Sequence, residues 1–141
     1  MSTHYTLGYW NTRAIGEPLR LLLSSKVPEE NWKDVRYQVG PPPNYDKSEW
    51  NNVKETLSYD FPNLPYLQIE KVDGENGTSV VRLTQMHAIM YYLGENFHML
   101  GKTADEKARV IMIIEAGRDW INSLFDVTYC NAPWYKDNED G

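Results

Sequence analysis

The sequence contains a single cysteine, Cys130, among 141 residues. One cysteine can form neither a disulfide within the chain nor a Cys-x-x-Cys redox pair, so a disulfide framework and a thioredoxin-type exchange mechanism are both excluded. His87 and His98 fall on one helical face, but three turns separate them by about 16 Å, which is too far to share a metal ion. We therefore expect no metal site.

Long apolar runs and long runs of positive charge are also missing. The apolar run near the N-terminus is short and has charged neighbours, so we expect neither a signal peptide nor a membrane-spanning segment. The formal net charge is −6, and an acidic balance argues against nucleic acid and anionic membrane surfaces as partners. We expect a reduced, soluble, cytoplasmic protein.

What is present is an ordinary globular composition in which strand and helix patterns alternate. The predicted strands cover residues 4–10, 32–39, 66–72 and 79–83. The predicted helices cover residues 13–25, a short patch at 48–57, residues 84 to about 97, and residues 103 to about 125. The order is βαβαββα followed by one long helix. We predict an α/β domain over residues 1–98 and the start of an all-α domain over residues 103–141.

Local signals support these boundaries. Pro18 falls early in its helix, where a missing amide donor costs least, and the Asp73-Gly74 and Asn76-Gly77 pairs favour a hairpin turn. Thr84 is predicted to cap the next helix, and Thr103 with Glu106 forms a capping-box signature. The expected buried stripe of the helix after Thr84 is Ala88, Ile89, Tyr92 and Leu93.

The last helix carries a wide apolar stripe that nothing downstream in the chain can cover. The stripe comprises Val110, Ile113, Ile114, Gly117, Ile121, Leu124 and Phe125. An exposed stripe of this size is typical of a partner surface or of a missing part of a domain. We expect this helix to begin a helical domain that the chain does not finish.

Several motifs, in order, identify the family that the sequence resembles. They are Thr6-Leu7-Gly8-Tyr9-Trp10, Arg20-Leu21-Leu22-Leu23, GPPPNYDKSEW ending at Trp50, DFPNLPYL ending at Leu67, and LTQ-x-x-AI ending at Ile89. In register over residues 6–129, they resemble the mu-class glutathione transferases. The resemblance implies a thioredoxin-like N-terminal domain, an all-helical C-terminal domain and a homodimer, with glutathione as co-substrate and no other cofactor.

The resemblance also implies roles for particular residues. Tyr9 matches the catalytic tyrosine that stabilises the glutathione thiolate, although taken alone it would be read as a core residue. Together with Tyr9, ten more residues match the family's glutathione site: Trp10, Lys47, Trp50, Lys54, Asn63, Leu64, Pro65, Gln85, Met86 and Asp119. The electrophile site is matched by Trp10, Thr12, Ile15 and Tyr129. Phe61 matches an aromatic that inserts into the neighbouring subunit, with a core role as the alternative.

Each binding match has its own expected contact. Lys47, Trp50 and Lys54 are expected to hold the glycine carboxylate of glutathione. The Leu64–Pro65 bond is expected to be cis and to expose backbone for the cysteinyl part. Gln85, Met86 and Asp119 are expected at the γ-glutamyl end, with Asp119 reaching across the dimer interface.

The sequence departs from the family pattern at several points besides the missing part of the helical domain, and two of these departures bear on glutathione binding. Lys47 stands where arginine is more usual, and lysine lacks the bidentate fork. Met86 replaces a small hydroxyl residue, and the loss of a buried hydroxyl partner costs about 1–3 kcal/mol, although the helix N-terminal amide can still meet a carboxylate. The hairpin over residues 71–80 is longer than the family's.

Three interpretations follow from these observations. The leading one is an enzyme that adds glutathione to small hydrophobic electrophiles. The second is a weak or inactive family member that binds ligands or dimerises, and the third is a fragment or alternatively spliced product of a longer protein.

Overall fold

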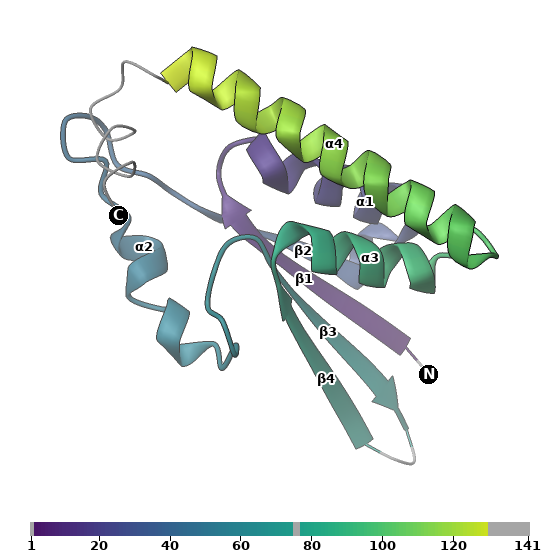
Figure 1. Ribbon diagram of the computed structural model, residues 1–141. Helices are drawn as coiled ribbons and strands as arrows, with labels where there is room; N and C mark the ends of the chain where they lie inside the picture. Colours follow the sequence, from purple (N-terminus) through teal and green to yellow (C-terminus); the bar gives the residue numbers. More distant parts are fainter. Residues whose placement is uncertain (1, 75–76, 130–141) are drawn as a thin grey trace. The chain divides into compact units, whose positions relative to one another are not determined.

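The computed structural model describes residues 2–74 and 77–129, except for the side chain of Tyr129. The chain divides into two compact units, Met1–Met99 and Leu100–Gly141. The first unit carries the sheet and three α-helices, and the second carries one long helix (Figure 1).

A mixed four-stranded sheet forms the centre of the first unit. Its strands are β1 (Ser2–Trp10), β2 (Trp32–Tyr37), β3 (Tyr66–Asp73) and β4 (Gly77–Thr84), in the order β2-β1-β3-β4. β1 runs parallel to β2 and antiparallel to β3, and β3 runs antiparallel to β4. A parallel neighbour requires a crossover connection, and α1 (Glu17–Lys26) supplies it. The predicted thioredoxin-like arrangement is confirmed.

The remaining helices of the first unit are short except for the one that follows β4. They are η1 (Ala14–Gly16), η2 (Glu29–Asn31), α2 (Ser48–Asn51), η3 (Lys54–Thr56) and α3 (Met86–Asn96), where η denotes a 3₁₀ helix. The helix predicted over residues 13–25 is thus η1 followed by α1. Ala14 has a φ of +34°, outside the right-handed region that an α-helix requires. Pro18 lies in the first turn of α1, as predicted.

An aliphatic core fills the space between the sheet and the helices α1 and α3. Leu7 pairs with Leu67 across β1 and β3, so both side chains point to the same face of the sheet. The buried members of the aliphatic core are Leu7, Leu19, Leu23, Val27, Leu67, Ile69, Met86, Ile89 and Leu93. Burial of such side chains is the main source of stability in a domain of this size.

Two predictions about α3 are wrong. The residue that precedes the helix is Gln85, whose side chain makes no capping hydrogen bond, whereas Thr84 ends β4. Ala88 is exposed, and the buried face starts at Met86, three residues before Ile89. The sheet decides the first point, because pairing of Thr84 with Tyr66 holds Thr84 in the strand.

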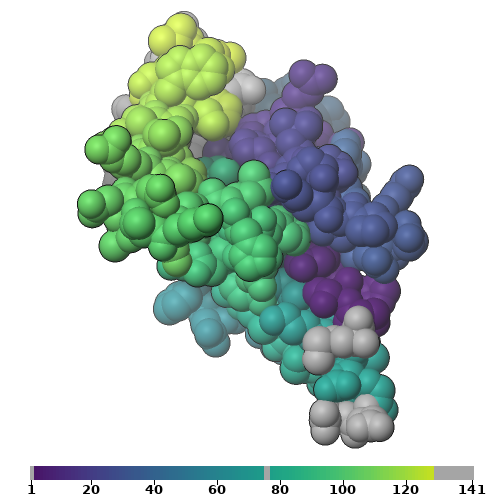
Figure 2. All heavy atoms as spheres, turned by 90° about the vertical axis from the view of Figure 1, so that its right-hand side faces the viewer, coloured from purple at the N-terminus to yellow at the C-terminus, as the bar shows by residue number. Residues whose placement is uncertain are grey.

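The hairpin of β3 and β4 extends as far as the start of β1. Ser2 pairs with Val72, so the beginning of β1 lies beside the hairpin end (Figure 2). Gly77 has a φ of +87°, a conformation that glycine adopts without steric cost. This agrees with the predicted turn, whose Asn76 lies outside the described residues.

The second unit contains α4 (Ala104–Tyr129), and the predicted capping box begins it. The amide of Glu106 donates to Thr103 Oγ1 at 3.2 Å, and the amide of Thr103 donates to Glu106 Oε2 at 3.1 Å. These bonds satisfy amides that an uncapped helix would leave without partners. Ile113 and Leu124 of the predicted apolar stripe on α4 are exposed, and so are Ile111, Met112, Trp120 and Val127 of the same helix. Within the described part of the chain, no helix is both long and apolar enough to cross a membrane.

Candidate functional site

One edge of the sheet gathers segments that are far apart in the sequence. Because β1 and β2 are parallel, both end at this edge, and the antiparallel pairing makes β3 begin and β4 end there (Figure 1). The register pairs Gly8 with Tyr66, and Tyr66 with Thr84. The end of β1, the Leu64–Pro65 segment and the turn into α3 therefore lie side by side. These three segments contain most of the predicted glutathione-binding residues of the first unit.

Tyr9 lies at the end of β1 and is only 6% exposed. Its ring packs so closely against Gly16 that a Cβ at this position would stand 2.3 Å from the Tyr9 ring. Burial raises the pKa of Tyr9 above its ordinary value, while a hydrogen bond with the backbone of Ile15 and the charge of Arg20 act in the opposite direction. A phenol with a raised pKa keeps its proton at neutral pH. It can therefore donate a hydrogen bond to an anion.

Around Tyr9 lies a second group of buried side chains, here called the aromatic cluster. Its members are Tyr9, Tyr37, Trp50, Tyr59, Leu64 and Tyr66. Trp50 stacks on Tyr66 at 6.0 Å between ring centroids, and the hydroxyls of Tyr37 and Tyr66 share a hydrogen bond of 3.0 Å. Trp10 and Ile15 pack against the cluster, partly buried. The fold thus brings residues from β1, β2, α2 and the start of β3 into contact.

The sequence interpretation did not anticipate Tyr37, Tyr59 or Tyr66 in this cluster. One signal for Tyr66 was available in Gly8, which stands between two buried residues of a strand. A Cβ on Gly8 would lie 2.1 Å from the Tyr66 ring. Glycine inside a strand often marks such a close approach.

The Leu64–Pro65 bond is cis, as predicted. Leu64 belongs to the aromatic cluster, and its amide donates to Asn63 Oδ1 at 2.8 Å. Asn63 itself is exposed. The contact of this segment with the cysteinyl part of glutathione stays a prediction.

The three residues predicted to hold a carboxylate differ in their surroundings. Trp50 is buried in the aromatic cluster, whereas Lys47 is exposed at the start of α2. Lys54 is half-buried, and its Nζ lies 3.8 Å from Glu55 Oε1. The two ammonium groups remain near the surface, where they can meet an anion, while Trp50 fixes the segment between them.

The turn into α3 places Gln85 and Met86 differently. Gln85 is exposed and has a φ of +70°, a strained conformation for a residue with a side chain. Met86 is 4% exposed and its side chain is part of the aliphatic core. A contact of Met86 with glutathione is therefore left to its main-chain amide at the helix N-terminus.

The other predicted residues are not members of the aromatic cluster. Thr12 is exposed in the turn after β1, and Phe61 is 75% exposed, so the alternative of a buried core role for Phe61 is wrong within this chain. Asp119 is exposed on α4 in the second unit. Tyr129 ends α4, and its side chain lies outside the described part. No group of three or more His, Cys, Asp or Glu side chains among the described residues could hold a metal ion.

Comparison with known proteins finds relatives that are named glutathione S-transferases. Glutathione S-transferase 2 of Gallus gallus is 45% identical over 105 residues, which are 74% of this chain and 43% of that protein. Glutathione S-transferase Mu 1 of Rattus norvegicus is 41% identical over 107 residues, 76% of this chain and 44% of that protein. No protein-family model matches the chain.

Solved structures give the same assignment. A nematode GST described as specific to C. elegans has a TM-score of 0.66 and 27% identity, over 91% of this chain and 53% of that one. The chain belongs to the glutathione S-transferase family. Relatives named as mu class are 37%, 41% and 43% identical to it, and the mu-class resemblance of the motifs is thereby confirmed. The chain spans about half the length of the curated relatives it matches.

Proposed function

We propose that this chain binds glutathione and holds its sulfur as a thiolate for transfer to small hydrophobic electrophiles. The observation that carries the proposal is a buried, protonated Tyr9 at the edge where the cis Leu64–Pro65 segment and the turn into α3 meet. Glutathione is the co-substrate, and the proposal includes no other cofactor.

The chemistry follows from the acidity of the thiol. A free thiol has a pKa of about 8.5, so only a few per cent is thiolate at neutral pH. A hydrogen bond from the Tyr9 phenol favours the charged form, and each pKa unit of lowering corresponds to about 1.4 kcal/mol. The thiolate then attacks an electrophilic carbon, a sulfur–carbon bond forms, and the leaving group departs with its electron pair.

Binding is assigned to groups at the same edge of the sheet. In the proposal, the ammonium groups of Lys47 and Lys54 neutralise the glycine carboxylate. The backbone of Leu64 pairs with the cysteinyl part of the peptide. Gln85 and the amide of Met86 meet the γ-glutamyl end, and Asp119 reaches its amine from a second subunit.

The proposal also includes the electrophile pocket, the assembly and the location. Trp10, Thr12, Ile15 and Tyr129 form the pocket. A homodimer is supported by the 75% exposed ring of Phe61, because large exposed aromatics are enriched at protein interfaces. A cytoplasmic location is supported by a single cysteine, which cannot form a disulfide within the chain.

A second candidate function is ligand binding with little turnover. It is favoured by Met86, since this side chain lies in the aliphatic core and offers no hydroxyl to the peptide. Retention on immobilised glutathione tests whether the binding site is competent. Turnover with a chloronitrobenzene substrate then separates an enzyme from a binding protein.

The role of Tyr9 is tested by the Tyr9→Phe variant. Loss of the phenolic proton is expected to raise the pKa of the bound thiol by about one unit or more, while the dissociation constant of glutathione changes little. The thiolate is followed by its ultraviolet absorbance during a pH titration of the complex.

Tyr91→Phe is the matched control, because Tyr91 is an exposed tyrosine on α3. This variant is expected to titrate like the unsubstituted chain. Superimposable titrations of Tyr9→Phe and the unsubstituted chain would remove Tyr9 from the mechanism.

A further inference from the structure

One buried charge in the first unit is not used by the proposed chemistry. Arg20 lies on α1 between the core residues Leu19 and Leu23 on the buried face of the helix, and it is 6% exposed. It is the sole charged side chain classed as buried within residues 2–74 and 77–129. A buried charge persists only when hydrogen bonds and opposite charge compensate for lost water.

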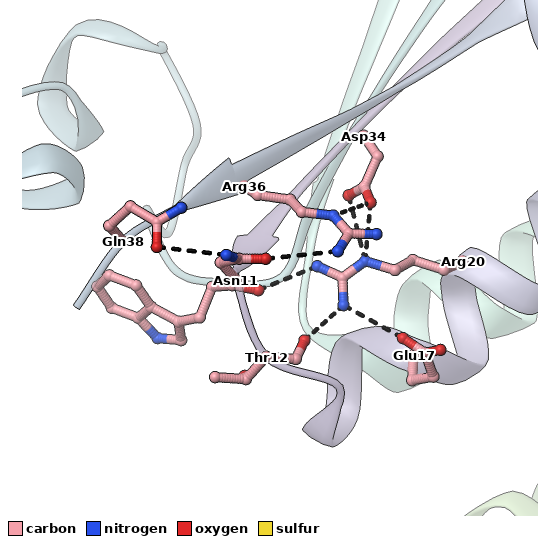
Figure 3. A network of polar contacts seen from close by, with 8 residues as sticks. Asn11, Thr12, Glu17, Arg20, Asp34, Arg36 and Gln38 are labelled. Atoms are coloured by element: carbon pink, nitrogen blue, oxygen red, sulfur yellow. Dashed lines mark hydrogen bonds and ion pairs between the residues drawn. The ribbon is translucent and has the colours of Figure 1, made fainter.

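Each nitrogen of the Arg20 guanidinium donates to the protein, with acceptors on β2, at the end of β1 and in the turn after it, and on α1 (Figure 3). Its Nε donates to both carboxylate oxygens of Asp34 on β2, at 3.2 and 3.0 Å. Nη2 donates to the carbonyl oxygen of Trp10 at 3.0 Å, and Nη1 donates to that of Thr12 at 2.5 Å. Nη1 also lies 3.4 Å from Glu17 Oε2, a longer contact.

The Trp10 carbonyl ends β1, and the Thr12 carbonyl lies in the turn that follows. The same turn is joined to β2 by the amide of Asn11, which donates to the carbonyl of Tyr37 at 2.7 Å. It leads into η1, where the backbone of Ile15 makes the hydrogen bond with Tyr9. Arg20 therefore contacts both the start and the middle of the segment that connects Tyr9 to its backbone partner.

Arg20 also lies over the Tyr9 ring, with Cζ 5.7 Å from the ring centroid. Gly16 packs against the same ring. The ring is thus held by a cation and by close-packed backbone. Because each of its three nitrogens already donates to the protein and only 6% of the residue is exposed, Arg20 is poorly placed to bind a ligand itself.

We propose that Arg20 is a positioning residue for the thiol-stabilising tyrosine, acting by fixing the turn over residues 11–16 and the ring of Tyr9. This inference rests on the proposed role of Tyr9. A lysine cannot replace the arginine, since an ammonium group is a point charge and cannot reach Asp34 and two carbonyls with the geometry of a planar fork.

The test is Arg20→Lys in the full chain, with the pKa of the glutathione thiol in the complex as the readout. A misplaced phenol is expected to raise this pKa by about one unit, with less than threefold change in glutathione affinity. The matched control is Arg36→Lys. Arg36 is exposed and also donates to Asp34, at 2.6 Å. Its contact with the turn over residues 11–16 is a long one to the Asn11 side chain, at 3.4 Å, and no hydrogen bond joins it to the Trp10 or Thr12 carbonyl among the described contacts.

A double substitution separates positioning from a direct effect of charge. If Arg20 acts through Tyr9, adding Arg20→Lys to Tyr9→Phe leaves the thiol pKa where Tyr9→Phe alone puts it. A further rise in the double variant overturns the proposal. The proposal is also overturned if the thiol pKa of Arg20→Lys equals that of the unsubstituted chain. It is overturned as well if Arg36→Lys raises the thiol pKa as much as Arg20→Lys does.

Failure of the proposed function is distinguishable from failure of this inference. If the unsubstituted chain and Tyr9→Phe give the same thiol pKa, the role of Tyr9 is wrong. If those two differ as expected and Arg20→Lys changes nothing, only the role of Arg20 is wrong. Should Arg20→Lys not fold, Asp34→Asn decides, because it weakens the anchor of Arg20. A rise in the thiol pKa then supports the inference, and an unchanged value overturns it.

Discussion

The aliphatic core and the aromatic cluster lie in the same unit but are built from different chemistry. The aliphatic core consists of nine side chains without a hydrogen-bonding N–H or O–H group. In the aromatic cluster, five of the six members carry such a group, and Leu64 is the exception. Aliphatic side chains can only be buried, whereas tyrosine and tryptophan combine an apolar body with a polar end.

The first unit thus has one cluster that contributes apolar burial and a second that carries the polar groups of the proposed site. Burial raises the pKa of Tyr59 and of Tyr66 well above the ordinary range, and that of Tyr9 above its ordinary value. All three phenols therefore keep their protons at neutral pH. The Tyr66 hydroxyl is hydrogen-bonded to the Tyr37 hydroxyl, whereas the Tyr59 hydroxyl is buried without a partner among the described residues. The reactive role proposed for Tyr9 thus depends on position, not on acidity.

The largest effect is expected from the aliphatic core. Leu23 and Leu21 both lie on α1, but Leu23 is 0% exposed and Leu21 is 63% exposed. Leu23→Ala is expected to lower the free energy of unfolding by about 2–5 kcal/mol, and Leu21→Ala to change it by less than about 0.5 kcal/mol. Urea denaturation measures both.

The same pair tests whether the two clusters are separable. In the folded Leu23→Ala protein, the pKa of the glutathione thiol is expected to match that of the unsubstituted chain. A raised thiol pKa in this variant would show that packing of the aliphatic core affects the site. The aliphatic core and the aromatic cluster would then not be separable.

Much of the fold could be predicted because its signals are local. The four short strand segments, the hairpin glycine Gly77 and the capping box at Thr103 each depend on a few neighbouring residues, and the structure contains all of them. The motifs around Tyr9 and Pro65 identified residues that the strand register brings to one edge of the sheet. The resemblance also anticipated the cis bond at Leu64–Pro65.

The remaining features depend on contacts between distant segments. Thr84 has the side chain of a helix cap, yet strand pairing with Tyr66 holds it in β4. Arg20 has the charge of a surface residue, but its acceptors come from β2 and from the turn after β1, which no local pattern reveals. Tyr59 and Tyr37 meet only through tertiary packing. Propensity is a weak guide wherever tertiary contacts compete with it.

A smaller effect is expected at Met86, which joins the two regions. Its side chain lies in the aliphatic core, while its amide begins α3 at the proposed γ-glutamyl site. Met86→Ser is expected to lower stability, because a buried side chain is lost. Because a serine hydroxyl is attached directly to Cβ, it stays close to the helix N-terminus instead of entering the core. It is expected to tighten glutathione binding by about 1–3 kcal/mol, roughly ten- to hundredfold.

Met86→Ala is the matched control, since it removes the same core contact without adding a hydroxyl. Calorimetric titration with glutathione is expected to give a lower dissociation constant for Met86→Ser than for Met86→Ala and for the unsubstituted chain. Equal dissociation constants for Met86→Ser and the unsubstituted chain would mean that this position does not contact the γ-glutamyl group.

The smallest effects are expected within the aromatic cluster, where two buried tyrosines differ in their partners. Tyr37→Phe removes the hydrogen bond of 3.0 Å to Tyr66 and leaves a buried hydroxyl unsatisfied, which is expected to cost about 1 kcal/mol of stability. Tyr59→Phe removes a buried hydroxyl that has no such bond, so stability is expected to stay the same or to rise slightly. Urea denaturation of the two variants side by side measures the difference. A loss of stability in Tyr59→Phe as large as that in Tyr37→Phe would mean that the Tyr59 hydroxyl is satisfied in solution. The hydroxyls of Tyr37 and Tyr59 would then both be hydrogen-bonded, and the two tyrosines would not differ in this respect.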